Sequence, residues 1–164
     1  MLNFDELSSA SHLLDGDAII CALGSTIKKV GSEEAFRKVD HDYPRLAARI
    51  AKQEGAKHFL LVSSLGADSH SRVFYNRVKG EVEKAIRALG YDRLTILRPS
   101  LLLGSRTEFR PAERLFQAVG WAIPGKYRPV HSRQVAAVLV NRLHREASGV
   151  ETIESDRIRL AARS

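Results

Sequence analysis

Short, nearly continuous apolar runs alternate along the chain with longer stretches that mix apolar and charged residues. Apolar runs of this length, bounded by glycine, serine or proline, are typical of buried parallel strands. The mixed stretches between them predict helices. The expected strands cover residues 17–24, 58–64, 93–99, 127–131 and 149–155. The expected helices cover residues 32–53, 75–89, 111–120, 133–147 and 156–162.

Three residues mark the expected helix ends. Pro44 is expected to break helix 32–53 and to begin its second part, because proline lacks a backbone N–H and suits the first turn of a helix. Gly90 is the expected stop of the helix that contains Tyr75. Ser132 is the expected N-cap of the helix that follows it.

Alternating strands and helices predict one α/β domain over residues 1–164, with a parallel sheet and flanking helices. Ligands of such sheets bind outside the carboxyl ends of the strands. This rule selects residues 23–26, the pair Ser63–Ser64 and residues 99–102. The helix that begins near Tyr75 follows the second of these strands, so Tyr75 is expected at the same rim.

The composition adds few constraints to this picture. With 164 residues, 44% of them hydrophobic and 27% charged, the chain is typical of a globular domain. Cys21 is the single cysteine, so no internal disulfide forms and a reducing compartment is indicated. The polar, acidic start does not resemble a signal peptide, and no apolar run approaches the roughly 20 residues that span a bilayer. The expected location is the cytoplasm.

The formal net charge of +7 raises the alternative of nucleic-acid binding. The basic residues are, however, scattered along the chain and interleaved with acidic ones, and no helix-turn-helix or zinc-ligand spacing is evident. A solvated basic surface is therefore favoured. A site for an anionic cofactor would use the same charge.

Tyr75 and Lys79 lie four residues apart, one helical turn, so their side chains share a helix face. A free tyrosine has a pKa of about 10 and needs a neighbouring positive charge to act as an acid or base near neutrality. The same spacing also arises by chance, as a surface tyrosine beside a surface lysine. The surrounding segments decide between the two interpretations.

Those segments resemble the short-chain dehydrogenase/reductase superfamily, whose domain has a Rossmann-like fold. The succession "CALGST", "VDHDY", "KHFLLVSSLGAD", "YNRVKGEVE" and "DRLTILRPSLLL" carries the resemblance. It is most similar to the atypical, NADPH-binding branch that contains the animal Tat-interacting protein and its bacterial relatives. The similarity runs from about Phe4 to near the C-terminus.

The resemblance implies roles for several residues. Tyr75 would be the general acid, Lys79 would supply the positive charge and bind the nicotinamide ribose, and Ser64, rather than Ser63, would hold the substrate oxygen. Cofactor contacts would come from Leu23, Gly24, Tyr75, Lys79, Leu102 and Arg110. The implied cofactor is NADP(H), with NAD(H) left open, and no metal is implied. Without the resemblance, the serines could instead cap a strand end and Arg110 could be a surface arginine.

One part of the family pattern does not occur in this sequence. A Gly-x-x-Gly-x-x-Gly turn, which would hold the pyrophosphate at a helix N-terminus, is not found. Met1 aligns where the family completes its third strand, so the fold is expected to lack the first βαβ unit and to leave strand 17–24 with an open edge. A start codon placed too late, a degenerate remnant, and a stable short variant without redox chemistry are the three explanations.

The expected function is that of an NADPH-binding oxidoreductase acting on a carbonyl or alcohol substrate. The alternative is a non-enzymatic regulatory or docking module on the same scaffold, with a protein partner or a second copy of the chain. A sugar-nucleotide epimerase is less favoured, because "SSLGAD" lacks the tyrosine usual after such serines. Nucleic acid and membrane are not expected as partners.

Overall fold

The computed structural model describes residues 4–103 and 125–162. A 3₁₀ helix, η1 (Phe4–Leu14), leads into strand β1 (Ala18–Cys21). Four strands form the main sheet in the order β1-β2-β3-β6, and every neighbouring pair is parallel. The other three are β2 (His58–Val62), β3 (Arg93–Arg98) and β6 (Gly149–Glu154). Within the described residues, β1 pairs with β2 alone. The parallel α/β architecture expected from the sequence is confirmed.

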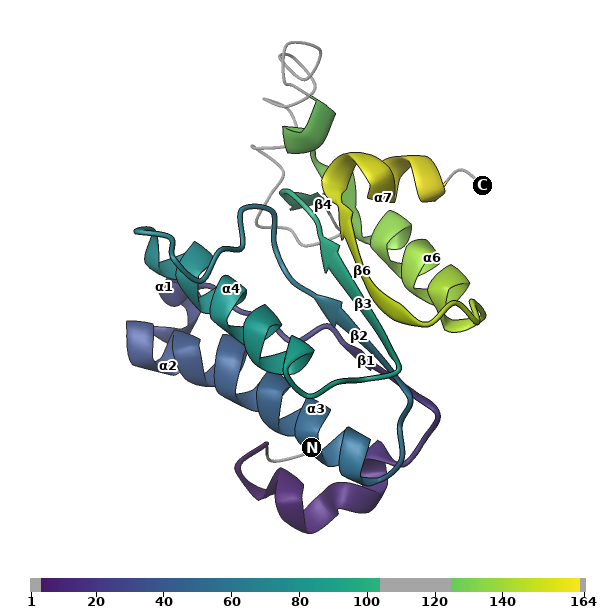
Figure 1. Cartoon of the computed structure of the whole chain (residues 1–164). Helices are drawn as coiled ribbons and strands as arrows, with labels where there is room; N and C mark the ends of the chain where they lie inside the picture. Colours follow the sequence, from purple (N-terminus) through teal and green to yellow (C-terminus); the bar gives the residue numbers. More distant parts are fainter. Residues whose placement is uncertain (1–3, 104–124, 163–164) are drawn as a thin grey trace.

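Helices cover both faces of this sheet (Figure 1). On one face lie α3 (Tyr43–Gln53) and α4 (Phe74–Arg87). On the other lie α6 (Ser132–Leu143) and α7 (Ser155–Ala161). The remaining elements are α1 (Ile27–Val30), α2 (Glu33–Arg37), η2 (Lys38–Asp42), β4 (Leu102–Leu103), η5 (Gly125–Tyr127) and β5 (Val130–His131). Strands β4 and β5 form a separate parallel pair.

Two hydrophobic cores form because successive strand residues point to opposite faces of the sheet. Phe59 and Leu61 of β2 pack with the α3 and α4 side, whereas Leu60 between them packs with the α6 and α7 side. Strand β3 divides in the same way, with Leu94 and Ile96 on the first face and Leu97 on the second. The continuous apolar runs in the sequence therefore correspond to strands buried on both faces.

The structure corrects two expected helix boundaries. The helix over 32–53 is interrupted just before Pro44, at the π-helical turn η2. The second part does begin near Pro44 as expected, since this residue lies in the first turn of α3. Proline is accommodated there because a π turn already interrupts the regular hydrogen-bond ladder. The N-cap of α6 is His131, one residue before Ser132. The helix expected over 111–120 lies outside the described residues.

Candidate functional site

The carboxyl end of β1 meets η2 and α4 at Gly24. A Cβ atom at this exposed glycine would lie 3.4 Å from Oδ1 of Asp40 and 3.7 Å from Nζ of Lys79. A methyl group at this position would therefore be in van der Waals contact with both charged groups. The loop after β1, the π turn and α4 converge at the rim that the sequence selected.

Lys79 is only 5% exposed although it carries a charge. Its ammonium nitrogen lies 2.6 Å from Oδ1 of Asp40, as an ion pair whose geometry departs from that of an aligned hydrogen bond. Oδ2 of Asp40 accepts a hydrogen bond from the backbone N–H of Ser25 at 2.8 Å. Asp40 thus ties the lysine on α4 to the loop that follows β1. A buried charge needs such a partner.

Asp40 lies inside the π turn η2, and its side chain is fully buried. Single π turns inside α-helices occur frequently at functional sites, because the extra residue redirects one side chain. Sequence analysis assigned Asp40 no role, although it belongs to the "VDHDY" segment that carried the resemblance. That segment was the feature of the sequence that could have indicated a role for Asp40. Its ion pair with Lys79 is seen only in the structure.

Tyr75 lies in the first turn of α4 and is half-buried. Its ring packs against that of the fully buried Phe36, with centroids 5.4 Å apart. The phenol is therefore anchored on one side by α2, while α4 places it one turn before Lys79. Lys79 in turn lies beside Gly24. The roles expected for these residues stay predictions.

The two serines after β2 differ in their surroundings. The hydroxyl of Ser63 donates to Oε1 of Glu83 at 2.6 Å, and that buried carboxylate also receives two hydrogen bonds from Arg98, at 2.9 and 2.7 Å. This contact raises the pKa of the Arg98 guanidinium. Ser64 is half-buried, and within the described part of the chain its hydroxyl makes one long contact, 3.4 Å, to the carbonyl of Leu65. The choice of Ser64 for the substrate stays a prediction.

The remaining predicted contacts are less closely grouped. Leu23 packs against the core between the sheet and α4, beside Gly24. Leu102 is 40% exposed in β4, where it pairs with Val130. Arg110 lies outside the described residues.

This arrangement fits a dinucleotide on two observations. Gly24 leaves open the space beside the Lys79 ammonium that a Cβ would occupy. The ammonium itself is a strong donor for ribose hydroxyls, and Asp40 holds it at the rim. Cys21 lies just beneath, inside the protein, where burial raises the pKa of its thiol; this favours a core role over a nucleophilic one.

A family model described as NAD(P)H-binding matches residues 2–146. The chain belongs to this NAD(P)H-binding family. It is 37% identical to protein HTATIP2 of Rattus norvegicus, a match that covers 96% of the chain and 67% of that protein. It is 43% identical to the mitochondrial protein fmp52 of Emericella nidulans, over 77% of the chain and 52% of the relative. The chain thus spans about half to two thirds of these relatives. The resemblance to the dehydrogenase/reductase superfamily is confirmed.

Solved structures confirm the fold of this NAD(P)H-binding domain. The dTDP-4-dehydrorhamnose reductase of Bacillus anthracis, in complex with NADP, superposes with a TM-score of 0.65 at 17% identity, covering 93% of the chain and 61% of the reductase. The enzyme WbmG of Bordetella bronchiseptica, in complex with NAD, superposes with a TM-score of 0.67 at 12% identity. This match covers 98% of the chain and 58% of WbmG. The two complexes contain different dinucleotides, and at such identities they establish the Rossmann-like fold alone.

The described residues hold no cluster of three or more His, Cys, Asp or Glu side chains suited to a metal ion. Over the same part of the chain, no helix is both long and apolar enough to cross a membrane.

Proposed function

We propose that this domain supports reduction of a carbonyl group, or oxidation of the corresponding alcohol, with NADP(H) as the redox partner. The observation that carries the proposal is the rim cluster: Tyr75 and Lys79 one turn apart, with Lys79 held by Asp40 beside an open glycine. These three side chains come from α4 and η2, elements fixed by the main core.

The dinucleotide, when bound, supplies or accepts the hydride. Leu23 and Gly24 would contact it from the loop after β1 and Leu102 from β4, and Lys79 would hold its ribose. Arg110 would offer charge to a phosphate. Fixing the cofactor beside a positioned acid lowers the barrier, because the reacting groups are already held close together and oriented.

Tyr75 would donate its phenolic proton to the carbonyl oxygen as that oxygen gains negative charge, and would take it back in the reverse reaction. The Lys79 ammonium stabilises the phenolate that remains. Ser64 would donate a second hydrogen bond to the same oxygen, since its hydroxyl makes one long contact among residues 4–103 and 125–162. Ser63, held by Glu83, would keep the end of β2 in place.

Calorimetric titration of the purified chain with NADPH, and with NADH for comparison, tests cofactor binding. We expect a micromolar dissociation constant for NADPH that weakens at least about tenfold in Lys79→Ala, because a charged hydrogen bond is lost. Lys84→Ala is the matched control, since Lys84 is exposed on the same helix. A folded chain that binds neither dinucleotide would contradict the proposal and favour a docking module.

Measuring turnover further distinguishes an oxidoreductase from a docking module. In a screen of carbonyl substrates, Tyr75→Phe should lower kcat by about 10²- to 10⁴-fold, as expected for loss of a general acid. The substitution keeps the ring that packs on Phe36, so the fold is preserved. Unchanged turnover in Tyr75→Phe would exclude the assigned role.

We also propose a cytoplasmic location. The buried, free thiol of Cys21 suits a reducing compartment. The fungal relatives are named mitochondrial, so fractionation of cells that produce the native protein is the direct test.

A further inference from the structure

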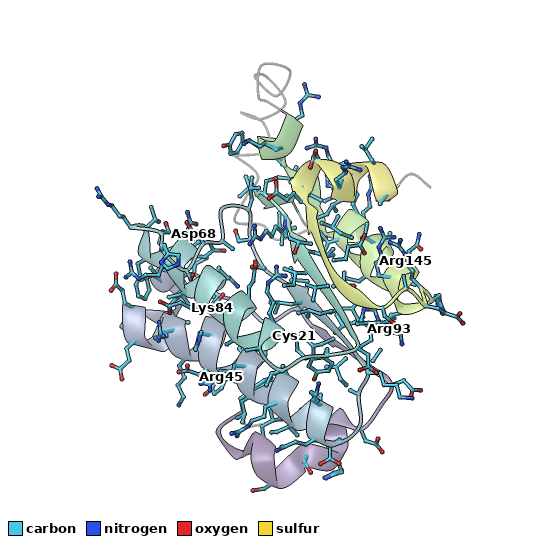
Figure 2. The ribbon with its side chains drawn as sticks, viewed as in Figure 1. Cys21, Arg45, Asp68, Lys84, Arg93 and Arg145 are labelled. Atoms are coloured by element: carbon cyan, nitrogen blue, oxygen red, sulfur yellow. The ribbon has the colours of Figure 1, made fainter. Side chains whose placement is uncertain are left out.

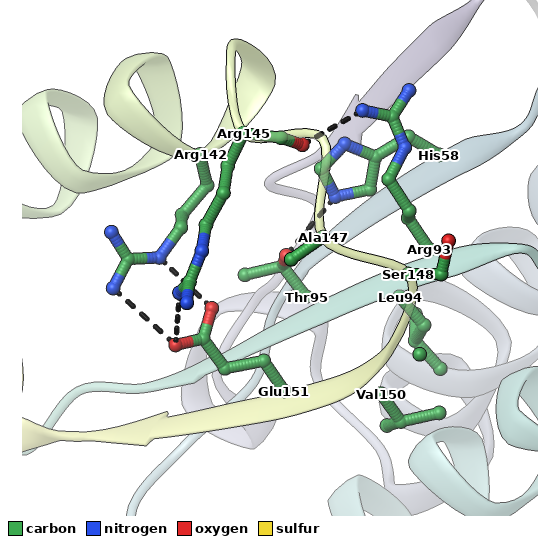
Figure 3. Close-up of a pocket in the computed structure, with 11 residues that line it drawn as sticks. His58, Arg93, Leu94, Thr95, Arg142, Arg145, Ala147, Ser148, Val150 and Glu151 are labelled. Atoms are coloured by element: carbon green, nitrogen blue, oxygen red, sulfur yellow. Dashed lines mark hydrogen bonds and ion pairs between the residues drawn. The ribbon is translucent and has the colours of Figure 1, made fainter.

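A second charged cavity lies at the opposite rim of the main sheet, at the amino ends of three strands (Figure 3). Its volume is about 160 Å³. That is several times the roughly 30 Å³ that one water molecule occupies in the liquid. His58 begins β2, Arg93 begins β3 and Gly149 begins β6, so this cavity is separated from Lys79 by the length of the strands. It is independent of the dinucleotide rim.

Positive charge dominates this cavity. Among the described residues that line it, Glu151 supplies one carboxylate against the guanidinium groups of Arg93, Arg142 and Arg145. Figure 2 shows Arg93 and Arg145 near each other, well away from Asp68 in the loop before α4. The excess of two positive charges in a partly enclosed space favours an anionic occupant.

Hydrogen bonds within the protein fix the three arginine side chains but do not use all of their N–H donors. Arg142 binds Glu151 through Nε at 2.9 Å and Nη2 at 3.3 Å, and Arg145 reaches the same carboxylate through Nη1 at 3.2 Å. Arg93 donates from Nη1 to the backbone carbonyl of Arg145 at 2.8 Å. Each guanidinium carries five N–H donors, so each retains donors beyond these bonds. The bonds pre-position the groups, as Figure 3 shows.

His58 provides an independent indication of a ligand. The residue is 2% exposed, and its Nε2 lies 3.0 Å from the hydroxyl of Thr95. Its other nitrogen, Nδ1, is buried and has no hydrogen-bond partner among the residues that the structure describes. When Thr95 donates to Nε2, Nδ1 carries the proton and can donate. Burial and the charge of Arg93 lower the pKa of His58, so the ring is neutral near pH 7. An oxyanion in the cavity, or a water molecule held by it, would satisfy this donor.

From these contacts we infer that the cavity is a binding site for a phosphate dianion, either inorganic phosphate or the phosphate of a small ester. Three arginines from two directions, with a buried imidazole between them, offer more donors than a planar carboxylate can accept. The site links the α6–β6 turn to the first residues of β2 and β3. Occupancy would therefore tighten this end of the sheet.

The test is a titration of the ¹⁵N-labelled chain with sodium phosphate, followed by two-dimensional NMR at constant ionic strength. We expect saturable shifts of amides in residues 93–95 and 147–151, reproduced by glycerol 3-phosphate if an ester is the ligand. Arg93→Met should weaken binding by about tenfold or more. Arg133→Gln, an exposed arginine at the other end of α6, should change nothing.

A pair of substitutions at His58 isolates the unpartnered nitrogen. His58→Gln places an amide near the position of Nε2 and should weaken phosphate binding, whereas His58→Asn places one near Nδ1 and should retain more of it. If Arg93→Met does not fold, Arg145→Gln serves in its place. Equal shifts with chloride or acetate, or shifts that Arg93→Met leaves unchanged, would overturn the assignment. NADPH binding by the Arg93 variant is expected to equal that of the native chain, which keeps this test separate from the proposed function.

Discussion

Asp40 and Lys79 together carry no net charge, so their influence is confined to groups within a few ångströms. Within that range the ammonium lies beside Gly24, while Asp40 also accepts a hydrogen bond from the backbone N–H of Ser25. The pair therefore positions a donor without creating a strong long-range field. It also makes Lys79 dependent on its partner, because a lone buried ammonium is costly.

Replacing Asp40 with asparagine should lower the free energy of unfolding by about 3–5 kcal/mol, since it removes one partner of a buried ion pair. Urea unfolding at pH 7 measures the change. Asp42→Asn is the matched control: its side chain is 55% exposed, and its contact with His41 should be worth less than about 1 kcal/mol. Equal losses in both variants would show that Lys79 finds another partner.

His58 should make stability depend on pH. Because burial and Arg93 lower the pKa of His58 in the folded state, the unfolded chain, with a histidine pKa of about 6.5, binds the proton more readily. The stability that this residue contributes is complete above pH 6.5 and is lost as the pH falls below it. The slope cannot exceed about 1.4 kcal/mol per pH unit.

Urea unfolding between pH 7.5 and 5.5 checks this expectation. The native chain should lose more stability over this range than His58→Gln, which has no titrating ring. His144→Gln removes an exposed histidine and should follow the native curve. Parallel curves for the native chain and His58→Gln would contradict the assignment.

Among the elements, α4 determines how closely the rim loops approach. Gly80 lies in its middle, where a Cβ atom would come within 2.1 Å of the backbone nitrogen of Ser69 and 2.2 Å of the carbonyl carbon of Asp68. The loop after β2 thus rests directly on the helix backbone. Glycine normally weakens a helix by about 1 kcal/mol relative to alanine, and here close packing outweighs that cost.

Gly80→Ala should therefore destabilise the protein by about 3 kcal/mol or more, because the obstructing atoms are backbone and cannot rotate away. Thermal unfolding gives the magnitude. Gly31→Ala is the comparison: φ is +89° but no atom lies within 4 Å of its Cβ, so backbone strain alone should cost about 1–2 kcal/mol. A stabilised Gly80→Ala would mean that the loop lifts off α4.

At the scale of the whole molecule, the sequence predicted a parallel sheet with flanking helices, because each strand had a local signal. The runs around Phe59 and Ile96 are apolar at every position, which identifies strands covered on both sides. The π turn had no comparably local signal, because no residue type marks the extra residue of such a turn, whereas proline is a known helix breaker. The sequence therefore predicts the break at Pro44, close to the end of η2.

Contacts between individual side chains of the site were harder to predict from the sequence. Tyr75 and Lys79 could be found because they are neighbours on one helix, and the adjoining segments had a recognisable family pattern. Asp40 is far from Lys79 along the chain, and Arg93 meets Arg145 only because β3 and the α6–β6 turn lie side by side. Such pairings depend on tertiary packing, which no local pattern reports.

The order of strands in the main sheet has a consequence for synthesis on the ribosome. Since β1, β2, β3 and β6 lie next to one another in the order in which they are translated, each strand emerges to find its neighbour already made. A nascent chain that has reached Arg98 already contains every residue of the core between the sheet and α4. The second face must wait for α6 and α7, so assembly can proceed vectorially, with the non-local β3–β6 pairing as its last and slowest step.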